Sequence, residues 1–226
     1  PYTLLVMLSS YSICRAMVMP ASFLVVLFYA IYLVVRNGVI SYQKASGLAM
    51  FSGIVIFCFY SFIRLKELLP VEKFGYDAIF FILLILCFAW GGDTCAYFAG
   101  RAFGKHKLCP VVSPKKTVEG AVGGVLGTMV FGVLVTVIYS VAADRMEAFT
   151  RSNIGVSMYI IIALLACVAA VLGIYGDLFA SVVKRQCGIK DYGTIFPGHG
   201  GILDRFDSVM FIAPFVTMVI IAVFYR

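Results

Sequence analysis

Residues 181–207 read SVVKRQCGIKDYGTIFPGHGGILDRFD, and the chain on either side of them is almost uniformly apolar. This stretch holds four of the eighteen Lys and Arg residues, three of the eleven acids and one of the two His residues. Charged groups between two segments of membrane-spanning length are costly unless they contact water, a metal ion or a ligand. The stretch therefore predicts that something charged is bound here.

The composition of the chain as a whole indicates a membrane protein. Its 226 residues are 62% hydrophobic and only 13% charged, with a mean hydropathy of +1.02. A soluble domain of this size cannot bury so much apolar surface. We therefore expect an all-α polytopic membrane fold with about six complete transmembrane helices, in a single integral-membrane domain over residues 1–226, to which the motifs below assign catalysis. Apolar segments near the ~20 residues that a bilayer needs lie at 16–36, 46–63, 77–99, 117–141, 156–183 and 206–225.

The start of the sequence is apolar at once, from Pro1 onward, and has no Met. We interpret residues 1–14 as the tail of a further, partial span and expect residues to be missing upstream of it. No cleavable signal peptide is expected, because its charge and cleavage pattern is not found.

Lys and Arg residues are distributed unevenly between the predicted loops. The side that holds loops 100–116 and 184–205 carries eleven of them, and the other side carries seven. Since cytoplasmic loops are richer in Lys and Arg, we expect a multi-pass protein of the cell (inner) membrane with its active site facing the cytoplasm. The net charge of +7 also suits an anionic substrate or lipid bilayer headgroups. No long basic run is present, so no nucleic-acid partner is expected.

Two overlapping pairs of glycines open the predicted span at 117–141. Gly120 and Gly124 are four residues apart, as are Gly123 and Gly127. Small residues at this spacing allow another helix backbone to approach closely. The pattern predicts packing, either within the monomer or across a dimer, and we expect a homodimer.

The first candidate cluster for chemistry is Asp177 with Ser181, Lys184 and Arg185. On a helix these residues lie along one face, so the acid sits one turn from a hydroxyl and two turns from a pair of cations. The structural alternative is an intramembrane ion pair between Asp177 and Lys184.

The second candidate cluster runs from Pro197 to Ser208. Its glycines, Gly200 and Gly201 among them, expose backbone N–H groups to an anion, and His199 lies beside them as a hydrogen-bonding group or proton carrier. If the turn that holds Asp204 and Asp207 is helical, both carboxylates point the same way and repel each other unless a cation lies between them. Oxygen ligands select a hard cation such as Mg²⁺. With Asp177, three acids are available to bind one or two metal ions. The alternative is that Asp204 and Asp207 cap the N-terminus of the last helix.

The third candidate cluster joins Asp93 to the basic loop that follows. Asp93 is an ionisable residue within a span, and we expect it to be a further metal ligand or to position a cation. Ser113 is expected to cap the next helix, with Lys115 and Lys116 in its first turn as a phosphate cradle. The alternative is ordinary cytoplasmic anchoring of that span.

These motifs resemble the signature of the phosphatidate cytidylyltransferase family, also called CDP-diacylglycerol synthases, of bacterial type. One block, within 177–208, reads Ser181-x2-Lys184-Arg185-x4-Lys190-Asp191-x-Gly193-x3-Pro197-Gly198-His199-Gly200-Gly201-x2-Asp204-Arg205-x-Asp207. A second block, from Asp93 to Glu119, contains GRAFGKHKL and SPKKTVEG. Together the two blocks cover about a quarter of the chain.

The resemblance implies transfer of the cytidylyl group of CTP to phosphatidic acid, giving CDP-diacylglycerol and pyrophosphate in phospholipid biosynthesis. It implies Mg²⁺, with a second cation as an option. We expect catalytic roles for Asp177, Lys184, Arg185, Asp204 and Asp207, and metal binding by Asp177, Asp204, Asp207 and Asp93. Substrate-binding roles are expected for Ser181, Lys190, His199, Gly200, Gly201, Arg205, Ser113, Lys115, Lys116, Arg101 and Lys105.

Two other functions remain open from the residues. One is a CTP-dependent polyprenol or dolichol kinase, which would transfer the γ-phosphoryl group to an alcohol. The other is an ion or phosphate transporter, whose charged residues would line a path at the bilayer midplane. The acids of this chain crowd toward one membrane side, which disfavours the transporter.

Overall fold

The computed structural model describes residues 12–35, 41–145, 155–194 and 200–224. The chain forms two compact units, Pro1–Glu67 and Leu68–Arg226. Each unit is described by itself, and all of the candidate site residues belong to the second one. The prediction of a single catalytic domain stays a prediction.

The first unit contains two apolar helices. Helix α2 spans Ser12–Val35 and α3 begins at Tyr42, runs through the unit and ends at Leu68. Large apolar side chains such as Phe23, Phe28 and Val34 are exposed along α2, as expected of a helix that faces lipid rather than water. Near the end of α3, Arg64 Nη1 forms an ion pair at 2.8 Å with Glu67 Oε2, one turn further on.

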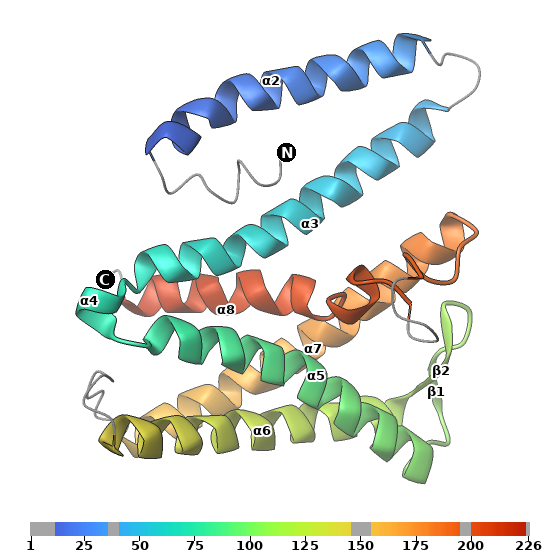
Figure 1. Cartoon of the computed structure of the whole chain (residues 1–226). Helices are drawn as coiled ribbons and strands as arrows, with labels where there is room; N and C mark the ends of the chain where they lie inside the picture. Colours follow the sequence, from blue (N-terminus) through green and yellow to red (C-terminus); the bar gives the residue numbers. More distant parts are fainter. Residues whose placement is uncertain (1–11, 36–40, 146–154, 195–199, 225–226) are drawn as a thin grey trace. The chain divides into compact units, whose positions relative to one another are not determined.

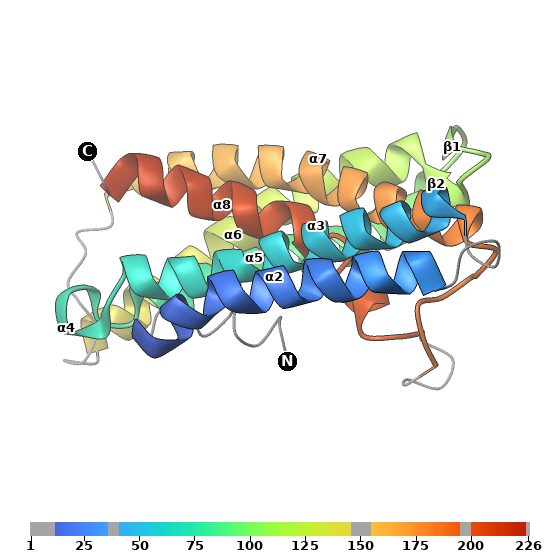
Figure 2. The same cartoon turned by 90° about the horizontal axis from the view of Figure 1, so that it is seen from above.

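The second unit is a group of long antiparallel helices (Figure 1). A short helix, α4 (Val71–Phe74), precedes α5 (Asp77–Phe103), and a β-hairpin then leads into α6 (Val118–Arg145). Helix α7 (Val156–Gln186) returns to the hairpin end, where a loop with the short 3₁₀ turn η1 (Leu203–Arg205) leads into α8 (Val209–Phe224). The hairpin and this loop lie at one end of the unit and α4 lies at the other (Figures 1 and 2).

The core of the second unit lies where α5 packs against α6, α7 and α8. Leu84 and Phe88 of α5, Ala169 of α7 and Ile212 and Val216 of α8 are all fully buried there. Burying one such aliphatic or aromatic side chain is worth about 1.5–3 kcal/mol when it leaves water. Inside a bilayer, close packing of the helices stabilises the fold instead of the transfer of these side chains out of water.

Four described helices are long and apolar enough to cross a membrane, by length and composition. They are Tyr42–Leu68, Asp77–Phe103, Val118–Ala142 and Val156–Gln186, and two shorter apolar helices cover Phe23–Val35 and Val209–Val223. The chain is thus a mostly helical, multi-pass membrane protein, and the predicted segments coincide with these helices to within a few residues at most boundaries. The predicted partial span at 1–14 lies mostly outside the described residues.

The glycine faces at the start of α6 pack directly on α5. A Cβ atom on Gly123 would collide with the Cβ of Ala99, and one on Gly127 would collide with the Cβ and Sγ atoms of Cys95. No larger residue fits either position without moving α5. This confirms the close-packing prediction within the chain; the homodimer stays a prediction.

The β-hairpin between α5 and α6 corrects two expectations, because the fold is not purely helical and Ser113 does not cap a helix. Strands β1 (Lys107–Cys109) and β2 (Ser113–Thr117) pair in antiparallel fashion, with Lys107 opposite Thr117. The side-chain oxygen of Thr117 accepts the N–H of Gly120 at 3.1 Å, which is the capping contact for α6. Lys115 and Lys116 therefore belong to an extended strand and not to the first helical turn.

Candidate active site

Asp177 of α7 contacts a hydroxyl from its own helix and a cation from the hairpin. Its Oδ1 atom accepts a hydrogen bond from Ser181 Oγ at 3.3 Å, which confirms that the two residues share a helix face. Its Oδ2 atom forms an ion pair with Lys116 Nζ of β2. The alternative pairing of Asp177 with Lys184 is wrong, since a cation more than sixty positions away in the chain takes that place.

Lys184 instead pairs with Asp204, in the loop before α8. The distance from Lys184 Nζ to Asp204 Oδ1 is 2.8 Å, and both side chains are nearly buried. The other oxygen of Asp204 accepts backbone N–H groups from Tyr192 at 2.8 Å and Gly201 at 2.9 Å. Burial by itself would raise the pKa of Asp204, but these hydrogen bonds outweigh it and hold the pKa below its ordinary value.

Asp207 is buried and has a different environment from Asp204. Its Oδ1 atom accepts the backbone N–H of Ser208 at 2.9 Å. Burial raises its pKa to about 7, and repulsion from the carboxylates of Asp177 and Asp93 adds to the rise. Asp204 lies in the 3₁₀ turn η1 and Asp207 follows that turn, so the α-helical turn on which the expectation of parallel carboxylates depended is not formed, and the two acids have different hydrogen-bond partners.

Asp93 of α5 completes a group of three acids from three elements. Ser208 Oγ donates a hydrogen bond to Asp93 Oδ2 at 2.8 Å, which ties α5 to the residue that precedes α8. Asp93, Asp177 and Asp207 are close enough to influence one another electrostatically. We call these three residues the carboxylate cluster.

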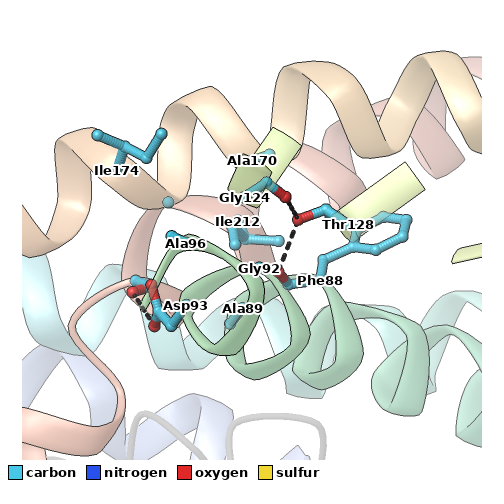
Figure 3. Close-up of a pocket in the computed structure, with 12 residues that line it drawn as sticks. Phe88, Ala89, Gly92, Asp93, Ala96, Gly124, Thr128, Ala170, Ile174 and Ile212 are labelled. Atoms are coloured by element: carbon cyan, nitrogen blue, oxygen red, sulfur yellow. Dashed lines mark hydrogen bonds between the residues drawn. The ribbon is translucent and has the colours of Figure 1, made fainter. Parts of the chain in front are cut away.

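Two cavities adjoin Asp93. The larger has a volume of about 630 Å³ and is lined by Trp90, Asp93, Thr94, Ile202, Asp204, Arg205, Phe206 and Asp207. The smaller, about 20 Å³, lies deeper between α5, α6, α7 and α8, with Asp93 at its edge (Figure 3). There Thr128 of α6 donates a hydrogen bond to the carbonyl of Gly124 at 2.8 Å. The larger cavity is the one with room for a substrate group.

Tyr192 organises the loop after α7, a role that was not predicted. Its hydroxyl donates to the carbonyl of Ala180 at 3.0 Å, and Lys184 Nζ lies 5.3 Å from the centre of its ring. Burial raises the pKa of the Tyr192 hydroxyl, and the nearby Asp204 charge raises it further. The available sequence signal was an aromatic residue directly after the charged pair Lys190 and Asp191.

Glu119 is a second residue with an unpredicted role, and it fastens the hairpin to α6. Its carboxylate accepts the backbone N–H groups of Lys105 at 3.1 Å and His106 at 3.2 Å. His106 Nδ1 lies 2.6 Å from Glu119 Oε1. The backbone N–H of Val118 also donates to the carbonyl of His106 at 2.9 Å. These contacts fix the strand that carries Lys116.

The remaining predicted site residues lie near the C-terminal ends of α5 and α7, on the hairpin and in the loop before α8. Exposed cations that form no ion pair with a described residue are Arg101, Lys105, Lys115, Arg185 and Lys190. Arg205 is exposed, and Ser113 is half-buried on β2. Gly200 has a φ of +82°, a left-handed conformation that favours glycine. His199 lies outside the described residues.

The carboxylate cluster suits a hard cation, although it does not enclose one as it stands. Among the described residues, no three His, Cys, Asp or Glu side chains are gathered closely enough to hold a metal ion. The cluster offers only oxygen donors, which hard cations prefer. Its acids repel one another, and Lys116 pairs with just one of them. A bound cation would relieve that repulsion, so the residues present fit Mg²⁺.

Comparison with known proteins identifies the family of the chain. Its residues 2–223 match the model of the cytidylyltransferase family. A phosphatidate cytidylyltransferase of Bacillus subtilis is 35% identical over 191 residues, 84% of this chain and 64% of the relative. One of Staphylococcus saprophyticus is 41% identical over 147 residues, 65% of this chain and 51% of the relative. The chain spans between half and two thirds of the length of these curated relatives. Because the family model matches nearly the whole sequence, this chain belongs to the cytidylyltransferase family.

Proposed function

We propose that this chain is the catalytic part of a phosphatidate cytidylyltransferase, which makes CDP-diacylglycerol from CTP and phosphatidic acid. The names of the relatives support this substrate pair, and so does the resemblance of the two motif blocks. The observation that carries the proposal is the convergence of Asp93, Asp177 and Asp207 from three elements, beside Lys116 and Lys184. Acids and cations together at the end of a helical membrane bundle suit a reaction between a nucleotide and a lipid phosphate.

In the proposed reaction an oxygen of the lipid phosphate attacks the α-phosphorus of CTP. A new phosphorus–oxygen bond forms to the lipid phosphate, and the bond from the α-phosphorus to the bridging oxygen of the β-phosphate breaks. Pyrophosphate leaves with that electron pair. The attacking phosphate is already ionised at neutral pH, so the protein needs mainly to position the reactants and neutralise their charge.

The proposed metal ligands are Asp93, Asp177, Asp204 and Asp207. Of these, Asp204 already has donors on both of its oxygens, so the carboxylate cluster is the stronger donor set. When bound there, Mg²⁺ supplies positive charge that offsets the charge of the phosphates. A second cation at the same acids is part of the proposal.

The cations fall into two groups. Lys116 and Lys184 are held in place by Asp177 and Asp204, so they supply positive charge at fixed positions beside the cluster. Exposed side chains of longer reach would meet the triphosphate and the lipid phosphate: Arg101, Lys105, Lys115, Arg185, Lys190 and Arg205. His199, outside the described residues, is proposed to join them. Ser113, Ser181 and the N–H groups of Gly200 and Gly201 would add hydrogen bonds, although Gly201 now donates to Asp204.

The proposed topology has about six complete spans and the site on the cytoplasmic side of the inner membrane, in a homodimer. The bias of Lys and Arg toward loops 100–116 and 184–205 supports this orientation. The orientation is tested in intact cells with Lys190→Cys and Thr150→Cys, each introduced into a variant that lacks the native cysteines. An impermeant thiol reagent should modify position 150 only, and modification of position 190 alone would reverse the orientation.

The reaction is tested with CTP labelled at either the α- or the γ-phosphate. Purified protein with Mg²⁺ and phosphatidic acid should transfer the α-label to lipid and release the γ-label as pyrophosphate. Transfer of the γ-label to a polyprenol would identify a kinase instead. Uptake of ions or phosphate into liposomes without CTP would identify a transporter.

A further inference from the structure

Trp90 joins helix α5 to the loop that carries two of the acids. It is the single Trp of the chain. Its indole Nε1–H donates a hydrogen bond to the carbonyl of Arg205 at 3.0 Å. Its ring meets the ring of Phe206 edge-on, with the centroids 5.9 Å apart. Arg205 and Phe206 are the two residues between Asp204 and Asp207.

The same segment of α5 also carries Asp93, one helical turn beyond Trp90. Trp90 therefore fixes the position of Asp207 relative to Asp93 through the residue that precedes Asp207. The loop has little regular structure of its own here, since η1 is a single 3₁₀ turn. Contacts to neighbouring elements must hold it. The ion pair of Asp204 with Lys184 ties the loop to α7, and Trp90 and the hydrogen bond from Ser208 to Asp93 tie it to α5.

We propose that Trp90 is a positioning residue, which holds the Asp204–Asp207 loop against α5 so that Asp207 and Asp93 face the same cation. The inference rests on the proposed function, because it assigns Trp90 a role in preparing that site. Hard cations need oxygen ligands at fixed distances. A loop that is already in place gives up less conformational freedom when the cation binds.

Packing alone is a weaker account of Trp90. The residue is 47% exposed and lines the larger cavity, so much of its ring surface is not buried in the helix core. Its polar N–H group reaches a backbone carbonyl that is far away in the chain. Removing that donor while keeping an aromatic ring separates the two roles.

The test uses Trp90→Phe, which keeps an aromatic ring and removes the N–H donor. Phe98→Leu is the matched control, because Phe98 is exposed on the same helix and contacts Tyr97. In metal-free protein, amide hydrogen exchange at residues 203–208 should become faster in Trp90→Phe. The Mg²⁺ concentration for half-saturation, measured calorimetrically, should rise roughly fivefold, as expected for the loss of one hydrogen bond.

Excess Mg²⁺ should then restore the turnover of Trp90→Phe, which it would not do for a variant that is merely misfolded. Phe206→Leu removes the ring contact and keeps the hydrogen bond, and it should also make amide exchange in the loop faster. It replaces Trp90→Phe as the test variant if Trp90→Phe does not fold. Unchanged loop exchange and unchanged Mg²⁺ half-saturation in the folded variant would overturn the inference. If the wild-type protein fails to bind Mg²⁺, the proposed function is contradicted instead. The role of Trp90 is still tested in that case, because loop exchange is measured in metal-free protein.

Discussion

Lys184 Nζ lies 2.8 Å from Asp204 Oδ1, and this ion pair fastens α7 to the loop before α8. The side chains are only 10% and 7% exposed, so neither charge is well hydrated. The two charges therefore compensate each other, and the N–H groups that donate hydrogen bonds to Asp204 further compensate its charge. Removing one partner leaves a buried charge without compensation.

We expect Asp204→Ala to lower the free energy of unfolding by about 3 kcal/mol, because Lys184 loses its partner in a nearly dry site. Lys184→Met alone should destabilise by a similar amount. The double variant should be less destabilised than the two single effects added together. Thermal unfolding in detergent without metal measures all three, and strict additivity would show that the pair does not interact.

Asp207 should make stability depend on pH in the metal-free protein. Its pKa is about 7 when folded and about 4 when unfolded. Between these values the folded state binds the extra proton, so stability should be highest at the acid end of this range and fall as pH rises toward 7. Asp207→Asn should remove this contribution and stabilise the metal-free protein at pH 8, by on the order of 2 kcal/mol.

Unfolding curves at several pH values, without Mg²⁺, measure this effect. Glu72→Gln is the control, since Glu72 is an exposed acid of α4 at the opposite end of the unit. If Asp207→Asn and the wild-type protein show parallel pH dependence, Asp207 does not carry the raised pKa.

Gly127→Leu should destabilise the contact between α5 and α6, because even a Cβ at this position would collide with Cys95. Overpacking of this kind costs about 1–3 kcal/mol or more. Gly47→Ala is a control on α3, where a Cβ meets nothing within 4 Å. A wild-type melting temperature in Gly127→Leu would contradict the close packing of these helices.

Glu119→Gln should loosen the hairpin and, through it, Lys116. The neutral amide keeps the shape of the side chain but weakens the bonds to the N–H groups of Lys105 and His106 and to the His106 ring. Hydrogen bonds to a charged group are stronger than those to a neutral amide. Amide exchange at residues 105 and 106 should speed up by at least tenfold, and unchanged exchange would show that Glu119 does not hold the hairpin.

The helical part of the fold was predictable from the sequence because each span is marked by its own run of apolar residues. The contact between Asp177 and Ser181 was predictable for a similar reason, since both belong to one helix and its repeat is known. The glycine spacing of α6 likewise indicated close packing before its partner helix was known.

Pairings between distant parts of the chain were not predictable in this way. Lys116 reaches Asp177 because β2 leads directly into α6, which packs against α7, and no local pattern indicates that pairing. The hairpin itself is too short for a clear alternating signal, and its Ser113 resembles a helix cap. The turn at Asp204 is 3₁₀ rather than α-helical, so the spacing of Asp204 and Asp207 did not predict their partners.

The carboxylate cluster is tested most directly by transfer of the α-phosphate label from CTP to phosphatidic acid, measured as Mg²⁺ is raised. The wild-type protein should show Mg²⁺-dependent transfer. Asp93→Asn, Asp177→Asn and Asp207→Asn should each reduce turnover by at least about a hundredfold while the protein stays folded, and Glu72→Gln should match the wild type. Near-normal transfer by the cluster variants at low Mg²⁺ would contradict the assignment of these three acids to the metal and the reaction.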